Sequence, residues 1–188
     1  MVRSSSINEY ASWYLHRQAR NGDTRPIPNT AEQQVQTMRE RHDGKMRKWF
    51  DTFTRWNIVL FEASEMGRLV FLESDWTKQE GLVVPGAEDY RLLDRVADKA
   101  MQSAYLERPS AHKHKAYYDA LASGSLNIAG DERVAICTAE ASEIMLNPSA
   151  RYYLLDGVGR CLPYMILTKA GKIQGRPVEA FLAERAIA

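Results

Sequence analysis

The stretch DGVGR, residues 156–160, brings a carboxylate, two glycines and an arginine together within five positions. The apolar run before it predicts a short buried strand, and the run after it predicts a helix from about Cys161 to Lys169. The amides of the first turn of such a helix have no partner within the helix, so that end of the helix favours anions. Arg160 could add a two-pronged contact to phosphate oxygens. The stretch therefore predicts a phosphate site formed by Gly157, Val158, Gly159, Arg160 and Cys161.

A second interpretation of the same stretch needs no ligand. The two glycines can satisfy the geometry of a turn, and Arg160 can pair with Asp156 or with another surface carboxylate. Because the motif is short, the sequence leaves both interpretations open.

Carboxylates near this stretch could support phosphoryl transfer, which needs bound Mg²⁺ and a group that orients the acceptor hydroxyl. Asp156 adjoins the predicted turn, and Glu140 and Glu143 follow the predicted strand RVAICTA. The two glutamates face the same way if their segment turns helically, although the more ordinary interpretation is that they are first-turn acids favoured by the helix dipole. We expect the catalytic groups to be among Asp156, Glu140 and Glu143, with Asp156 as the Mg²⁺ ligand.

The cysteines and histidines offer weaker signals. Cys161, at a predicted helix start beside Arg160, is expected to have a lowered thiol pKa, whereas Cys137 lies in an apolar strand typical of the core. His112 and His114 are two positions apart, and no cysteine or carboxylate cluster stands beside them. That pattern favours a basic helix start over a metal site.

Helical periodicity dominates the first third of the chain. Ser6 predicts the cap of a helix that ends near Asn21. Thr30 and Gln33 resemble a capping box that opens a long helix, and the aromatic spacing predicts that this helix continues through Phe53. The expected continuation includes Met46, Trp49 and Phe50. Residues 1–55 are therefore predicted to be a helical extension.

The remaining residues, 56–188, are predicted to form one α+β domain, to which this helical extension is attached. WNIVLFEA and RLVFLES are β-rich runs separated by SEMG, which predicts a hairpin near 56–73, or two strands joined by a short turn. Helices are expected over 88–104 and 112–123, and strands at RVAICTA, YYLL and RPVEAFLA. The fold class is therefore α+β, with a mixed β-sheet and the N-terminal helices packed outside it.

Composition limits the possible functions. The 188 residues, 45% of them hydrophobic, can bury one sizeable core. Lysine plus arginine (25) nearly equals aspartate plus glutamate (24), which disfavours a protein that coats DNA or an acidic membrane. We find no apolar run long enough for a membrane span and no secretory signal, and two cysteines give no disulfide framework. A cytoplasmic protein is expected, with its oligomeric state open.

The segment YYLLDGVGRCLPYMIL, followed by GRPVEAFLA, resembles the signature of the ParB/sulfiredoxin-like fold over about the last third of the chain. In that family a G-x-x-R loop holds the phosphates of a nucleotide, which implies this role for Gly157, Arg160 and the amides between and after them. Val158 stands where sulfiredoxins carry their reactive cysteine, and Gly159 where family members commonly have a histidine or a second arginine. The resemblance therefore does not imply sulfiredoxin chemistry. We also expect no helix-turn-helix region of the segregation type, because the sequence stops at Ala188.

Among the family, the free-serine kinases are similar in size and layout. The resemblance thus implies an ATP-dependent phosphotransferase that acts on a small hydroxyl-bearing metabolite, with ATP and Mg²⁺ as cofactors. Two alternatives stay open. A non-catalytic nucleotide-sensing or partner-binding module needs only the phosphate site, and a ParB-like nuclease needs a basic surface that the near-neutral charge disfavours.

Overall fold

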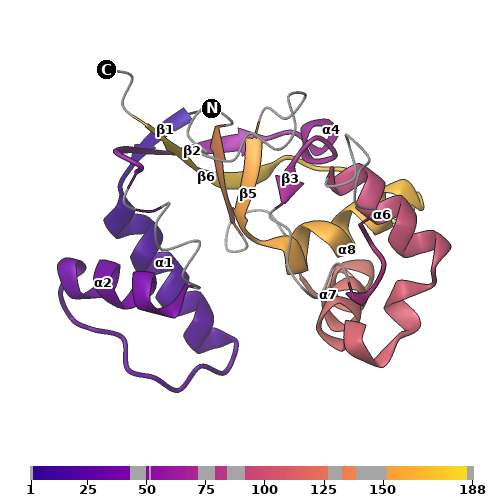
Figure 1. The fold of residues 1–188 in the computed structure, drawn as a ribbon, viewed down its shortest axis with the longest axis horizontal. Coiled ribbons are helices and arrows are strands. Elements are labelled where there is room, and N and C mark those ends of the chain that lie inside the picture. Colours follow the sequence, from indigo (N-terminus) through magenta and orange to yellow (C-terminus); the bar gives the residue numbers. More distant parts are fainter. Residues whose placement is uncertain are drawn as a thin grey trace.

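The computed structural model of the protein describes residues 2–42, 50, 52–71, 79–83, 92–126, 133–138 and 152–185. Six strands among these residues form one mixed sheet, in the order β1-β2-β6-β4-β5-β3 (Figure 1). The strands are β1 Val2–Ser5, β2 Arg55–Phe61, β3 Val70–Phe71, β4 Val134–Thr138, β5 Tyr152–Asp156 and β6 Val178–Glu184. The helices are α1 Ile7–Arg20, α2 Ala31–Arg41, α4 Ala63–Met66, α6 Leu93–Gln102, α7 His112–Ala122 and α8 Val158–Lys169, with 3-10 turns at Tyr105–Glu107 and Pro109–Ala111. The predicted α+β class, with a mixed sheet, is confirmed.

Helices cover both faces of the sheet. Along β4, Val134 and Ile136 belong to the apolar cluster that includes α6, α7 and α8, whereas Ala135 and Cys137 belong to the cluster that includes α1 and α2. This alternation follows from the two-residue period of a strand, which sends successive side chains to opposite faces. The helices of the first third therefore pack outside the sheet as predicted, on the face opposite α6, α7 and α8 (Figure 1).

The N-terminal residues contribute a strand that the sequence did not predict. Val2–Ser5 form β1, which pairs with β2 in antiparallel register, with Val2 opposite Val59. The short polar sequence VRSS has no β pattern of its own. It forms a strand because it pairs with β2, and the sequence alone could not predict that pairing. Residues 1–55 are thus not wholly helical, and their first strand joins the same sheet as β2.

Helix α1 matches its prediction. The Ser6 side chain accepts a hydrogen bond from the Glu9 amide, which caps the helix, and Asn21 ends it. The buried stripe consists of Tyr10, Ala11, Tyr14 and Leu15.

The predicted long helix is wrong. The Thr30 side chain accepts from the Gln33 amide and opens α2 as expected, but the helix ends at Arg41. His42 takes an extended backbone, with φ −79° and ψ 149°, and its ring stacks on Tyr14 at 4.4 Å between centroids. Phe53 lies outside any helix, while Met46 and Trp49 lie outside the described residues. Aromatic packing against α1 therefore overrides the local helical spacing.

The hairpin near 56–73 is also wrong, whereas the alternative of two strands with a short connection is confirmed. Strand β2 pairs with β1 and β6, whereas β3 pairs in parallel with β5 near the other edge of the sheet. The segment between them forms the short helix α4, where Glu62 and Glu65 bond reciprocally as a capping box. Two β-rich runs that are close in the sequence therefore form strands that lie far apart in the sheet, because strand pairing depends on long-range packing.

The other predicted elements hold within the described residues. Helix α6 lies inside the predicted range 88–104, and α7 ends just before Gly124, whose φ of +73° suits a helix stop. The strands at RVAICTA, YYLL and RPVEAFLA correspond to β4, β5 and β6. No helix in the described part of the chain is long and apolar enough to cross a membrane.

Candidate functional site

The stretch DGVGR occupies the end of a strand and the first turn of a helix. Strand β5 ends at Asp156, Gly157 makes the turn alone, and α8 begins at Val158, three residues earlier than expected. The amides of Arg160 and Cys161 both donate to the Gly157 carbonyl, at 2.9 and 2.8 Å. The outward-directed amides of this helix end are therefore those of Val158 and Gly159.

Only glycine fits at position 157. Its backbone has φ +118°, a conformation that side chains rarely adopt. An added Cβ would also lie 2.8 Å from Cγ1 of Val134 and 2.9 Å from Nη2 of Arg160. Gly159 has no such constraint, because an added Cβ there would meet the His114 ring at an ordinary 3.5 Å.

Asp156 binds two guanidinium groups. Its Oδ2 accepts from Nη2 of Arg160 at 3.0 Å and from Nη1 of Arg17 in α1 at 3.2 Å. The side chains of Arg160, Arg17 and Asp156 are 2%, 15% and 20% exposed. We call these three residues the Arg17–Asp156–Arg160 triad; two positive charges and one negative charge leave it with a net charge of +1.

Trp13 completes the contact between the two helical layers. The guanidinium carbons of Arg17 and Arg160 lie 5.6 and 5.3 Å from the centroid of its ring, within the range of cation–π attraction. Helices α1 and α8 cover opposite faces of the sheet, so the triad and Trp13 join them at the end of β5.

The electrostatics of the triad keep Asp156 ionised. Burial alone would raise the pKa of its carboxyl, but Coulomb interactions with Arg160, then with Arg17 and His42, outweigh burial and hold that pKa below its ordinary value. Burial, followed by the negative charge of Asp156, raises the pKa of Tyr14 to about 12. Among the described residues, the site therefore holds the ionised carboxylate of Asp156 beside cations and the neutral phenol of Tyr14.

The predicted site residues fall into three groups. Arg160 pairs with Asp156, as in the ligand-free interpretation of DGVGR, and its contact with phosphate stays a prediction. Val158 and Gly159 are half-buried at the helix end, whereas Cys161 is buried. Glu140 and Glu143 lie outside the described residues.

The surroundings of Asp156 do not fit a Mg²⁺ ion bound by this carboxylate. Two guanidinium groups already donate to Oδ2 of Asp156. Both would repel a divalent cation, which would have to displace them in order to bind this carboxylate. The described residues also contain no group of three or more histidine, cysteine, aspartate or glutamate side chains that could hold a metal.

Two contributors were missed in the sequence. Arg17 lies three residues after Tyr14, on the buried side of α1. A charged residue within this apolar stripe was the signal in the sequence that could have indicated its role. The His114 ring lies beside Gly159, and its Nδ1 is 2.7 Å from the hydroxyl of Tyr105. Burial and then the neighbouring His112 lower the pKa of His114, which favours the neutral imidazole.

The expected lowered pKa of the Cys161 thiol is wrong. Burial raises it to about 12, and the nearby Arg160 only partly opposes this effect. Burial likewise raises the pKa of Cys137 to about 12. Both cysteines are free and buried, so they belong to the core.

We expect both thiols to resist labelling in the native protein. Reaction with a thiol-specific disulfide reagent should be about a hundredfold or more slower in native buffer than in urea, because it requires local opening. The measurement is the absorbance of the released thiolate with time, with the unfolded protein as the control for two reactive thiols. Labelling of Cys161 at the unfolded rate in native buffer would contradict its burial.

No protein-family model, no curated protein and no solved structure matches this chain.

Proposed function

We propose that the start of α8 binds the phosphate groups of a nucleotide, and that the protein acts as a non-catalytic nucleotide-sensing module. The observation that carries this proposal is the placement of two guanidinium groups, those of Arg17 and Arg160, at that helix end. The helix dipole and the outward amides of Val158 and Gly159 favour an anion at the same place.

A hollow beside the triad supports the choice of a nucleotide. It has a volume of about 560 Å³ and is lined along α1 by Ser12, Trp13, His16, Ala19 and Arg20. Trp13 belongs both to this hollow and to the contact with Arg17 and Arg160. An aromatic ring next to a cationic site suits a base joined to phosphates.

The state of Asp156 favours a binding module over a phosphotransferase. A carboxylate with a lowered pKa is a weak base, and Asp156 is bonded to two guanidinium groups. Phosphoryl transfer would therefore depend on other carboxylates, such as Glu140 and Glu143. The ATP-dependent phosphotransferase stays a prediction that rests on the family resemblance.

A matched pair of variants tests the phosphate site. Gly159→Asp should raise the apparent Kd for ATP by about tenfold or more, because its carboxylate repels phosphate at the helix end, while Gly159→Asn should change it by less than about threefold. An acid in the first turn stabilises a helix, so the loss would not reflect unfolding. Binding is measured by thermal shift with ATP, ADP, CTP and GTP; a ligand at 100 times its Kd adds about 2.7 kcal/mol of stability.

The outcomes separate the possible functions. Equal nucleotide binding by Gly159→Asp and Gly159→Asn would contradict a phosphate site at this helix end. ADP formation from ATP, Mg²⁺ and a mixture of hydroxyl metabolites would favour the phosphotransferase, especially if Glu140→Gln slowed it by about 10²-fold. Nucleotide binding without ADP formation is the result that the module predicts.

A further inference from the structure

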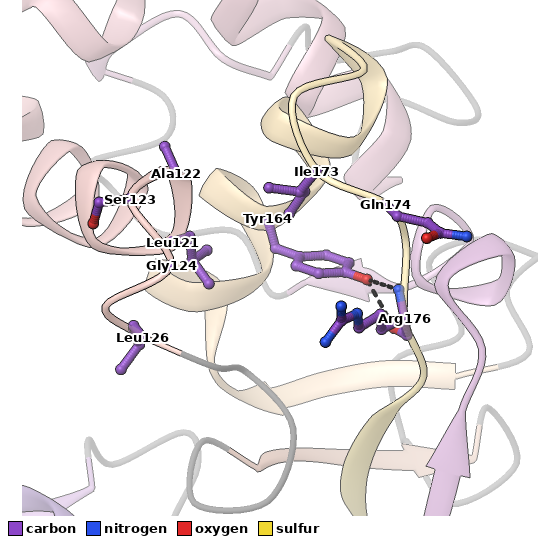
Figure 2. A pocket seen from close by; sticks show the side chains of 9 residues that line it. All are labelled: Leu121, Ala122, Ser123, Gly124, Leu126, Tyr164, Ile173, Gln174 and Arg176. Carbon is purple, nitrogen blue, oxygen red and sulfur yellow. Dashed lines mark hydrogen bonds between the residues drawn. The ribbon is translucent and has the colours of Figure 1, made fainter.

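A second pocket lies away from the start of α8, between the end of α7 and the loop that follows α8 (Figure 2). Its volume is about 440 Å³, within the range of about 300–1,000 Å³ that is usual for small-ligand sites. Leu121 and Leu126 line it on the α7 side, and Ile173, Gln174 and Arg176 line it on the loop side. Tyr164 of α8 lies between the two sides.

Part of the wall of the pocket is apolar and part is polar. Leu121 and Tyr164 are buried members of the core cluster, and Leu126 and Ile173 pack against that cluster while staying partly exposed. A ligand that covers these four side chains would remove their remaining apolar surface from water, which favours binding.

Tyr164 holds the loop side in place. Its hydroxyl accepts from the Arg176 amide at 2.6 Å and donates to the Arg176 carbonyl at 2.7 Å. Both backbone groups of Arg176 are therefore fixed on the core, while its side chain is exposed. Figure 2 shows the guanidinium beneath the Tyr164 ring, directed toward the side where Leu121 and Leu126 lie. A cation whose backbone is held in this way is partly organised before a ligand arrives.

The charge of the pocket is positive. Among the described residues that line it, Arg176 is the single charged residue, and its guanidinium makes no hydrogen bond or ion pair within the described part of the chain. The end of α7 would disfavour an anion through its carbonyls, but those of Asp119, Ala120 and Leu121 already accept hydrogen bonds. Lys172, next to Ile173 in the sequence, is not among the lining residues, and it donates to the Tyr118 hydroxyl at 2.8 Å.

We propose that this pocket binds a small carboxylate ligand with an aromatic or branched aliphatic body. The carboxylate would form the two-pronged bond that suits one guanidinium, and the apolar body would lie against Leu121, Tyr164 and Ile173. One cation matches the single charge of a carboxylate better than the double charge of a phosphate ester.

The test uses three probes of one shape: 3-phenylpropionate, the neutral 3-phenylpropanamide and the cationic 3-phenylpropylammonium. We expect 3-phenylpropionate to give saturable amide shifts at Gly124, Ile173 and Gln174 in two-dimensional NMR spectra, with at least about tenfold tighter binding than the amide probe. Arg176→Gln should abolish that difference. Arg176→Glu should reverse the preference, so that the ammonium probe binds best.

Controls keep the result specific. Arg55→Gln, which removes an exposed arginine from β2, should bind 3-phenylpropionate as the unmodified protein does. ATP should not displace the probe, because the proposed nucleotide site lies at the other end of α8. The proposal is overturned if the three probes bind equally, if none gives saturable shifts at millimolar concentration, or if Arg176→Gln leaves the preference for the carboxylate intact.

Discussion

Asp156→Asn is expected to lower the free energy of unfolding by about 3 kcal/mol, because it removes the negative charge that two buried or nearly buried cations share. Arg160 is 2% exposed and Arg17 is 15% exposed, so water cannot replace the lost carboxylate at little cost. Urea denaturation at neutral pH measures the change. Asp119→Asn is the control, since Asp119 pairs with Lys115 on the surface and its loss should leave stability nearly unchanged.

The same variant carries a pH dependence with a defined sign. The pKa of Asp156 is lower in the folded protein than in the unfolded chain, where aspartate titrates near about 3.9. Its stabilisation is therefore complete above that unfolded value and is lost as the pH falls through the lower, folded value. The difference in stability between the unmodified protein and Asp156→Asn should shrink in acid. A difference that stays constant from neutral pH into strong acid would contradict the ion pairing.

Gly157→Ala is expected to destabilise the protein by about 3 kcal/mol. The methyl group meets Val134 at 2.8 Å, and the backbone conformation at φ +118° adds strain for any residue with a side chain. Gly159→Ala is the matched control two residues away. It lies inside the first turn of α8, where alanine favours the helix by up to about 1 kcal/mol and the nearest contact is an ordinary 3.5 Å.

Thermal and urea unfolding of the two alanine variants test this contrast. We expect a lower midpoint for Gly157→Ala and an equal or higher midpoint for Gly159→Ala. Similar decreases in the unfolding midpoint of both variants would contradict the assignment of the special backbone geometry to Gly157 alone. A stable Gly157→Ala protein would contradict the close approach of β4 and α8 at this point.

Local signals predicted the elements that depend on local physics. The caps at Ser6 and Thr30 were predicted because a side-chain oxygen bonds an amide three residues ahead, which is a relation within one turn. The strands β4, β5 and β6 were predicted because they are apolar runs bounded by polar residues. The turn at Gly157 was predicted because only glycine adopts its backbone freely.

Pairing between distant segments was not predictable in the same way. The partner of β3 is β5, about eighty residues away in the sequence, and no pattern in RLVFLES distinguishes that pairing from a hairpin with β2. At the end of α2, likewise, His42 leaves the helix and its ring packs against Tyr14 of α1, a contact between separate segments of the chain. Periodicity describes one element at a time, so it could not anticipate either outcome.

The sequence by itself determined that Asp156, Gly157 and Arg160 share one strand–helix junction, because their spacing and the glycine fix the local backbone. Only the tertiary structure decided the direction in which Arg160 points and which charge joins it. Arg17 comes from the opposite face of the sheet, 139 residues before Asp156 in the chain, and its bond to Asp156 places a second guanidinium group at the junction. The electrostatics of Arg160 depend on the charged groups around it, and these groups come together only when the helices pack on both faces of the sheet.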